Sequence, residues 1–254
     1  MQLIRPAGYH LDMDGMRSLS SGPSLSVPVV LFDVDGTLVR TEGRSRHSRA
    51  FKTAFRELFG CECSFTSEMH GMTDLQIFMT LARELPGVDG RCRALAEVAC
   101  RRMVEIYREP DPEDGHYVLL PGVPEALQRL SSSGAILGLL TGNVPEIALD
   151  KLTSVRADRF FSFGAYGSEA EERSALPPIA MARAAAIAGG QVDPRRVFIV
   201  GDTPRDVACA LDNGCRAVAV ATGFFTADDL CSAGAELVLP NLLEIDPLLK
   251  LLEL

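Results

Sequence analysis

The chain lacks several features that would assign it to a broad class of proteins. No apolar run approaches the roughly 20 residues needed to cross a bilayer, and charges and prolines interrupt the first residues, so we predict neither a membrane span nor a signal peptide. An excess of positive charge is also missing, because 25 lysines and arginines stand against 34 aspartates and glutamates, a formal net charge of -9. This balance argues against nucleic acid or a membrane surface as partners and favours a small molecule.

Paired cysteine motifs are absent as well. The seven cysteines contain no C-x-x-C spacing, and an odd number cannot be fully paired within one chain. Several of them fall in apolar, helix-like contexts, which are typical of reduced and buried thiols. We therefore expect a cytoplasmic protein without a cysteine metal site.

The composition is that of an ordinary globular protein. Hydrophobic residues make up 47% of the 254 residues and charged residues 23%, which allows a sizeable buried core. Residues 1–27 mix glycine, proline and serine without periodicity, and we predict a poorly ordered extension there. Val29 to Phe32 then form a short, continuous apolar run, typical of a strand buried on both faces of a parallel sheet.

Helical periodicity dominates the next stretch of the chain. Apolar residues recur at helical spacing from about residue 45 to 110, so we predict an all-helical cap domain over residues 41–117. The exit from this insert, residues 109–121, is rich in proline, aspartate and glycine, which indicates a linker or hinge. Together with residues 39–45, it is expected to let the insert open and close.

After the insert, strands and helices alternate. The predicted helices are 123–132, 145–154, 177–188, 204–213 and 241–252, and the predicted strands are 135–140, 160–163, 197–200, 216–221 and 237–239. Strands that alternate with helices of this length favour right-handed crossovers. We therefore predict an α/β fold, a doubly wound, Rossmann-like parallel sheet built from residues 28–40 and 118–254.

Three of the expected strands end in polar motifs. These are D-V-D-G-T at residues 33–37, T-G-N at 141–143 and G-D-T-P-R-D at 201–206. In open parallel sheets, ligands bind beyond the carboxyl ends of the strands, so the three motifs are expected to meet at one edge of the sheet. Each motif also has a plainer interpretation, as a turn or, for Asp202 and Thr203, as a helix cap.

The residue types in these motifs suit phosphoryl chemistry. Side chains two apart on a strand point the same way, so Asp33 can act as a nucleophile while Asp35 protonates the leaving oxygen. Asp202 adds a third carboxylate, and such crowding calls for a cation. Mg²⁺ prefers oxygen ligands, which Asp33, the backbone carbonyl of Asp35 and Asp202 can supply. The hydroxyl of Thr141 and nearby backbone amides would hold the phosphoryl oxygens.

In their order and spacing the motifs resemble the haloacid dehalogenase superfamily of phosphohydrolases, with its D-x-D-G-T, strand-end Thr or Ser, basic residue and G-D-x-x-x-D. The likeness covers about residues 28–240 and is greatest to the phosphoglycolate-phosphatase-like group with a helical cap. The basic residue of the family is usually lysine, and counting back from Gly189 places Arg173 at its position. Arg173 also lies in a charged run, 169–173, that is typical of a solvated surface.

The resemblance implies an Mg²⁺-dependent phosphatase that forms an aspartyl-phosphate on Asp33. It also implies that Asp206 joins the metal site and that Gly142, Asn143 and Arg173 bind phosphate. The expected substrate is a small phosphorylated metabolite, phosphoglycolate-like or a sugar phosphate, and the expected state is a monomer or homodimer. A phosphosugar mutase and a catalytically silent binding protein of the same fold are the alternatives. Five residues lie near the expected mouth of the site, where contact with the substrate is open but an ordinary surface or capping role is favoured for each: Arg44, Arg46, His47, Thr73 and Asp74.

Overall fold

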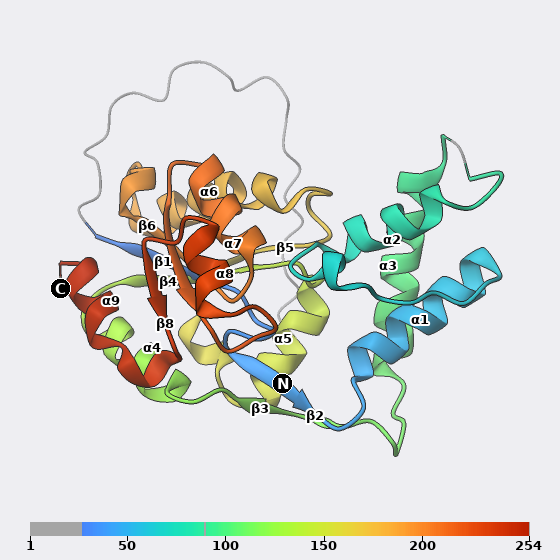
Figure 1. The fold of residues 1–254 in the computed structure, drawn as a ribbon, viewed down its shortest axis with the longest axis horizontal. Helices are drawn as coiled ribbons and strands as arrows, with labels where there is room; N and C mark the ends of the chain where they lie inside the picture. The colour runs from blue at the N-terminus through green and yellow to red at the C-terminus, as the bar shows by residue number, and fades with distance from the viewer. Residues whose placement is uncertain (1–26, 89, 254) are drawn as a thin grey trace, which may run out of the picture.

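A six-stranded parallel sheet forms the centre of the protein, as a computed structural model describes it for residues 27–88 and 90–253 (Figure 1). From one edge to the other the strands are β5 (Gly164–Tyr166), β4 (Ile136–Thr141), β1 (Val29–Phe32), β6 (Val197–Gly201), β7 (Arg216–Val220) and β8 (Leu237–Leu239). All neighbouring strands of this sheet run parallel. This confirms the predicted fold class. The predicted extension at residues 1–27 lies outside the described residues, apart from its last residue.

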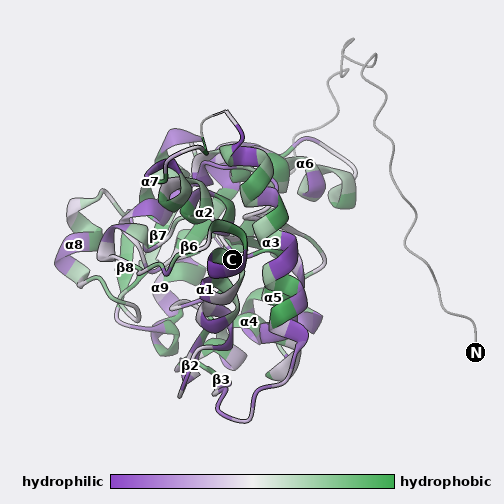
Figure 2. Ribbon diagram, turned by 90° about the vertical axis from the view of Figure 1, so that its right-hand side faces the viewer, coloured by the Kyte–Doolittle hydropathy of each residue, from purple (hydrophilic) through white to green (hydrophobic). Residues whose placement is uncertain are grey.

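Helices cover both faces of the sheet. The first face packs against α4 (Val123–Ser132), α5 (Pro145–Ser154) and α9 (Asp246–Leu251), and the second against α6 (Leu176–Ala188), α7 (Pro204–Asp212) and α8 (Ala227–Ser232). In β1, the side chains of Val30 and Phe32 enter the first core, while those of Val29 and Leu31 enter the second. An uninterrupted apolar strand is what this position requires, because neither face meets water. Figure 2 shows the hydrophobic colour on β6 and β8, whereas the outer helices carry both colours.

Three further helices form a helical unit between β1 and β4 in the chain, at the right of Figure 1. They are α1 (Arg46–Phe59), α2 (Asp74–Arg83) and α3 (Cys92–Arg108), and they share a hydrophobic core of their own. The rings of Phe51 and Phe78 stack there, with their centroids 3.8 Å apart. Val144 and Ile147, at the start of α5, complete this core, so the helical unit is packed against α5. Its division from the sheet as a separate domain stays a prediction.

The connections between the sheet and the helical unit are a β ribbon. Strand β2 (Val39–Glu42) pairs antiparallel with β3 (His116–Leu119), with Val39 opposite Leu119. The interpretation of residues 109–121 as linker throughout was therefore wrong for the part that forms β3. The ribbon ties the two connections together, and whether the helical unit opens around them stays a prediction.

Two other elements differ from the predicted ones. The run Phe160–Phe163 is not a strand: Asp158–Phe160 form a 3-10 turn, and the strand starts at Gly164. The predicted helix 241–252 is split into a 3-10 turn, Leu242–Glu244, and α9. Pro247 near the start of α9 has no amide hydrogen to continue the preceding turn. Among the described residues, no helix is both long enough and apolar enough to cross a membrane.

Candidate active site

The three predicted motifs meet at the carboxyl edge of the sheet. Asp33 follows β1, Thr141 ends β4 and Asp202 follows β6, and β1 lies between the other two strands. The amide of Asp33 still donates a hydrogen bond to the carbonyl of Val200, 2.9 Å away, so the nucleophile candidate is held by the sheet itself. All three side chains are buried. The parallel topology thus brings together residues that are 61 to 169 positions apart in the chain.

The turn after Asp33 needs glycine. Gly36 has a left-handed backbone, with φ at +78°, and a Cβ there would lie 2.4 Å from a carboxylate oxygen of Asp202. The next residue, Thr37, donates a hydrogen bond from its hydroxyl to Asp202, with the oxygens 3.1 Å apart. The D-G-T part of the motif therefore lets the first and third strand ends approach each other and orients the Asp202 carboxylate.

Arg173 is the cation of the site. It starts the short turn Arg173–Ala175 before α6, and its side chain is 5% exposed, so it does not belong to the solvated surface. Its Nη2 lies 3.0 Å from Asp33 Oδ1 and 2.6 Å from Asp206 Oδ1. Burial works against its charge, but Asp206 and Asp33 raise the pKa of Arg173 further above its ordinary value, and it stays protonated. The position predicted for the basic residue is therefore in contact with the predicted nucleophile.

Asp206 has both carboxylate oxygens in use. Oδ1 accepts from Arg173, while Oδ2 accepts from the amide and the hydroxyl of Thr203, at 3.0 and 2.7 Å. Thr203 and Asp206 form a capping box at the start of α7, so the helix-cap interpretation of this motif is correct for Thr203. These contacts place Asp206 where it orients Arg173, and its role as a metal ligand stays a prediction.

The crowded carboxylates hold their protons more tightly than usual. Burial raises the pKa of Asp33 to about 6, against the attraction of Arg173, and Asp206 and Asp35 add to the rise. Burial, Asp33 and Asp206 likewise raise the pKa of Asp202 well above its ordinary value. A group of buried acids in this state would gain from a further cation.

A divalent ion fits these residues. One carboxylate oxygen from each of Asp33, Asp202 and Asp206 lies within 4.8 Å of the others, and all three residues are buried. Opposite oxygens around an octahedral Mg²⁺ are about 4.2 Å apart at metal–oxygen distances of about 2.1 Å, so oxygens within 4.8 Å of one another could close on one small ion with side-chain shifts of less than about 1 Å. The donor set is all oxygen, which is the chemistry that Mg²⁺ selects.

Asp35 belongs to a second polar group beside this cluster. Its Oδ2 accepts from Lys151 Nζ at 2.6 Å and from Asn143 Nδ2 at 2.9 Å. Lys151 also donates to Asn143 Oδ1, 2.6 Å away. Burial tends to raise the pKa of Asp35, but the charges of Lys151 and His47 outweigh it, and the pKa is lowered. The Asn143 side chain, which we expected at the phosphate, is thus engaged with Asp35, and its phosphate role stays a prediction.

Lys151 was missed by the sequence analysis, although a signal was present. It lies on α5 between Ile147 and Ala148 on one side and Leu152 on the other, at the spacing of the buried face of that helix. A lysine at such a position is unusual, because a buried ammonium group needs partners. Its partner Asp35 precedes it by 116 positions and could not be identified from the sequence.

The helical unit reaches the site through the start of α2. The amide of Asp74 donates to the carbonyl of Gly142, 2.7 Å away, and the Asp74 carboxylate accepts from the amide of Val144 at 3.0 Å. A Cβ on Gly142 would lie 2.2 Å from the carbonyl oxygen of Met72, so the second motif needs glycine for this contact. Arg173 adds a hydrogen bond to the carbonyl of Gly71 at 3.1 Å. The helical unit therefore covers the site.

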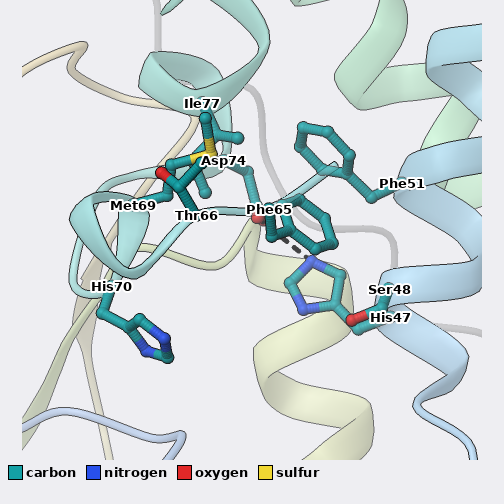
Figure 3. A pocket seen from close by; sticks show the side chains of 9 residues that line it. All are labelled: His47, Ser48, Phe51, Phe65, Thr66, Met69, His70, Asp74 and Ile77. Carbon is teal, nitrogen blue, oxygen red and sulfur yellow. Dashed lines mark ion pairs between the residues drawn. The ribbon is translucent and has the colours of Figure 1, made fainter. Parts of the chain in front are cut away.

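Two adjoining cavities are found here, one between the sheet and the helical unit and one inside the helical unit. One, of about 170 Å³, is lined by Asp33, Asp35 and Asp202 from the sheet and by His70 and other residues of the helical unit. The other, of about 210 Å³, lies within the helical unit, and Figure 3 shows its lining. The residues of the second cavity are His47, Ser48, Phe51, Phe65, Thr66, Met69, His70, Asp74 and Ile77.

The two cavities share part of their lining. Five residues line both: His47, Met69, His70, Asp74 and Ile77. His47 Nε2 lies 3.1 Å from Asp74 Oδ1, although the two are not aligned as a regular hydrogen bond. Figure 3 marks the ion pair of His47 and Asp74 with a dashed line. The arrangement gives one polar end at the strand motifs and one largely apolar end in the helical unit, which suits a small molecule with a polar head group.

Comparison with known proteins agrees with this arrangement. The sequence model of the haloacid dehalogenase-like hydrolases matches residues 30–220. A probable phosphatase, IndB of Dickeya dadantii, is 28% identical over 86% of this chain and 91% of its own length. A phosphoglycolate phosphatase of Chromobacterium violaceum is 30% identical over 61% of this chain and 67% of its own.

Solved structures share the fold. A predicted phosphatase from Clostridium acetobutylicum superimposes with a TM-score of 0.65 at 21% identity, covering 90% of this chain and all of its own. The CbbY protein of Rhodobacter sphaeroides, solved with phosphate, gives 0.63 at 22% identity over 87% of this chain and 96% of its own.

Proposed function

Because this chain is a phosphatase of the haloacid dehalogenase-like hydrolase family, we propose that it hydrolyses a small phosphate ester in an Mg²⁺-dependent reaction through an aspartyl-phosphate on Asp33. The observation that carries the proposal is the setting of Asp33. Its carboxylate is buried beside two further carboxylates, with the guanidinium of Arg173 only 3.0 Å away. A phosphoryl group bound in front of it would meet a nucleophile and a fixed positive charge at once.

The first half of the reaction uses Asp33 and Arg173. Asp33 attacks the phosphorus atom, and the bond to the leaving oxygen breaks on the opposite side. Arg173 holds Asp33 Oδ1, so Oδ2 is the oxygen that faces the substrate, and the guanidinium offsets charge during the transfer. Thr141 offers its hydroxyl to a phosphoryl oxygen. When bound by Asp33, Asp202 and the backbone carbonyl of Asp35, Mg²⁺ supplies positive charge to the carboxylates and the phosphoryl group.

Asp35 serves both halves of the reaction. Its pKa is lowered in the free protein, so it takes up a proton when the anionic phosphoryl group binds beside it. It gives this proton to the leaving oxygen as the P–O bond breaks, and it then takes a proton from the water that attacks the aspartyl-phosphate. Its side chain is 43% exposed, into the space between the sheet and the helical unit, so it can reach both the leaving group and the water. Hydrolysis of the acyl phosphate restores Asp33 and releases inorganic phosphate.

The two cavities support a small ester as the substrate. The phosphoryl group would occupy the cavity at the strand ends, and the organic group would extend past His47 and Asp74 toward Phe51 and Phe65. The second cavity, about 210 Å³, holds on the order of seven water-sized groups at ~30 Å³ each, which suits a metabolite and not a macromolecule.

A panel of phosphorylated metabolites assayed for phosphate release, with and without Mg²⁺, tests the proposal. Turnover is expected only with the metal and is expected to fall to background in Asp33→Asn, which keeps the shape of the side chain but removes the nucleophile. Beryllium fluoride in the presence of Mg²⁺ should form an adduct on Asp33 of the wild type and not of the variant, as detected by fluorine NMR. Equal turnover by the variant, or no adduct on the wild type, would refute the aspartyl-phosphate.

A further inference from the structure

A lysine with almost no exposure to solvent sits directly behind the proposed proton donor. The side chain of Lys151 is 1% exposed. Its Nζ lies 2.6 Å from Asp35 Oδ2, 2.6 Å from Asn143 Oδ1 and 3.2 Å from His47 Nδ1. An ammonium group has three hydrogens to donate: Asp35 Oδ2 and Asn143 Oδ1 accept two of them, and His47 Nδ1 accepts the third when His47 is neutral and carries its proton on Nε2. Lys151 is therefore an ordered part of the site, because its ammonium group has the polar partners that a buried charge requires.

The contacts select one oxygen of Asp35. Lys151 and the Asn143 amide both donate to Oδ2, so this oxygen is held as an acceptor and the proton to be transferred belongs on Oδ1. Asn143 is fixed in turn, because its Nδ2 also lies 3.0 Å from Thr141 Oγ1. When hydrogen bonds fix one oxygen of a carboxyl group, the other oxygen points in a constant direction. Proton transfer to a bound leaving group needs such a fixed orientation.

The third acceptor of Lys151 comes from the helical unit. His47 lies on α1, and its other ring nitrogen faces Asp74 at the start of α2. The partners of Lys151 are thus complete only while the helical unit covers the site. The hydrogen bonds that orient Asp35 therefore depend on the helical unit covering the bound substrate.

We propose that Lys151 is a positioning residue for the proton transfer by Asp35, a role that rests on the proposed phosphatase function. As the P–O bond breaks, its electron pair stays on the leaving oxygen, and the proton passes from Asp35 Oδ1 to that oxygen. Asp35 becomes a carboxylate, and the charge of Lys151 stabilises it through Oδ2. Lys151 does not touch the substrate, so its effect depends on how much the leaving group needs a proton.

The test compares two kinds of substrate. Acetyl phosphate releases acetate, which is stable as an anion, whereas an alkyl phosphate from the substrate panel releases an alkoxide that must be protonated. In Lys151→Met, the ratio of kcat/KM for the alkyl phosphate to kcat/KM for acetyl phosphate is expected to fall by about 10- to 100-fold, as for partial loss of a general acid. Asp35→Asn should lower the same ratio further, and adding Lys151→Met to it should change the ratio by less than about 3-fold, because the two act as one unit.

Two further variants keep the outcome interpretable. Lys151→Gln retains a donor for Asp35 and is expected to fall between the wild type and Lys151→Met, and it replaces the latter if that variant does not fold. Lys250→Met, an exposed lysine on α9, is the matched control and should leave the ratio unchanged. Equal losses on both substrates, no loss on either, or additive effects with Asp35→Asn would overturn the role of Lys151. A wild type that hydrolyses neither substrate would instead overturn the proposed function.

Discussion

The raised pKa of Asp33 predicts that removing its charge stabilises the protein when no metal is bound. A carboxyl whose pKa rises from 3.8 to about 6 on folding costs about 3 kcal/mol of stability at pH 8, because the folded state must ionise a group that it prefers to keep neutral. Asp33→Asn has the shape of the neutral form and leaves Arg173 paired with Asp206. The variant should therefore be more stable than the wild type by up to about 3 kcal/mol at pH 8 in the presence of EDTA.

The sign of the effect is fixed by the pH at which each state releases its proton. Between pH 3.8 and about 6 the unfolded chain ionises Asp33 before the folded protein does, so this group makes the wild type less stable as the pH rises. The advantage of Asp33→Asn should thus be near zero at pH 4 and reach its full size above pH 6. Mg²⁺ at 100 times its Kd should stabilise the wild type by about 2.7 kcal/mol and so cancel most of this advantage, because the variant has lost a ligand.

Urea unfolding followed by circular dichroism at pH 4, 6 and 8, with EDTA or Mg²⁺, measures these differences. Asp228→Asn, at an exposed aspartate of α8, is the control and should stay within about 0.5 kcal/mol of the wild type. Two results would show that folding does not raise the pKa of Asp33. One is an Asp33→Asn variant that is less stable than the wild type in EDTA at pH 8. The other is a stability difference that does not change with pH.

Three further outcomes are expected. Gly142→Ala places a methyl group 2.2 Å from the carbonyl oxygen of Met72, so it should lower stability by about 1–3 kcal/mol and raise KM. Thermal unfolding and steady-state kinetics measure the two effects. An unchanged KM would show that the contact between Gly142 and the segment before α2 is unimportant for substrate binding. Arg173→Lys keeps a positive charge near Asp33 but loses the planar guanidinium that also reaches the carbonyl of Gly71, so kcat/KM should fall by about 10-fold. Arg173→Met removes the charge, and kcat/KM should fall by more than about 100-fold. Equal losses in the two variants would contradict a role for the charge. With glucose 1-phosphate, a phosphatase releases inorganic phosphate, whereas glucose 6-phosphate as the product would support the mutase alternative.

Much of the sheet could be predicted from short-range pattern. The strands are apolar on both sides and the helices apolar on one, so their existence and order follow from local periodicity. The prediction from local pattern was wrong for the edge strand β5, which follows a run of aromatic residues. Phe160 to Phe163 have the composition of a strand, but the ring of Phe163 fills the space beside Gly138, and pairing with β4 starts only at Gly164. Only the neighbouring strand decides where an edge strand begins.

The sequence by itself determined which strand ends carry carboxylates and a hydroxyl, and the parallel order of the strands was enough to predict that these residues meet. The basic residue Arg173 lies before α6 and not at a strand end, and it was located by its distance from Gly189. Tertiary structure alone decided how they are oriented. It turned the Asn143 side chain toward Asp35, gave both oxygens of Asp206 to Arg173 and Thr203, and placed Lys151 against a partner 116 positions earlier. The physical reason is that strand ends share an edge by topology, whereas hydrogen bonds depend on ångström-scale positions that packing between the helical unit and the sheet sets.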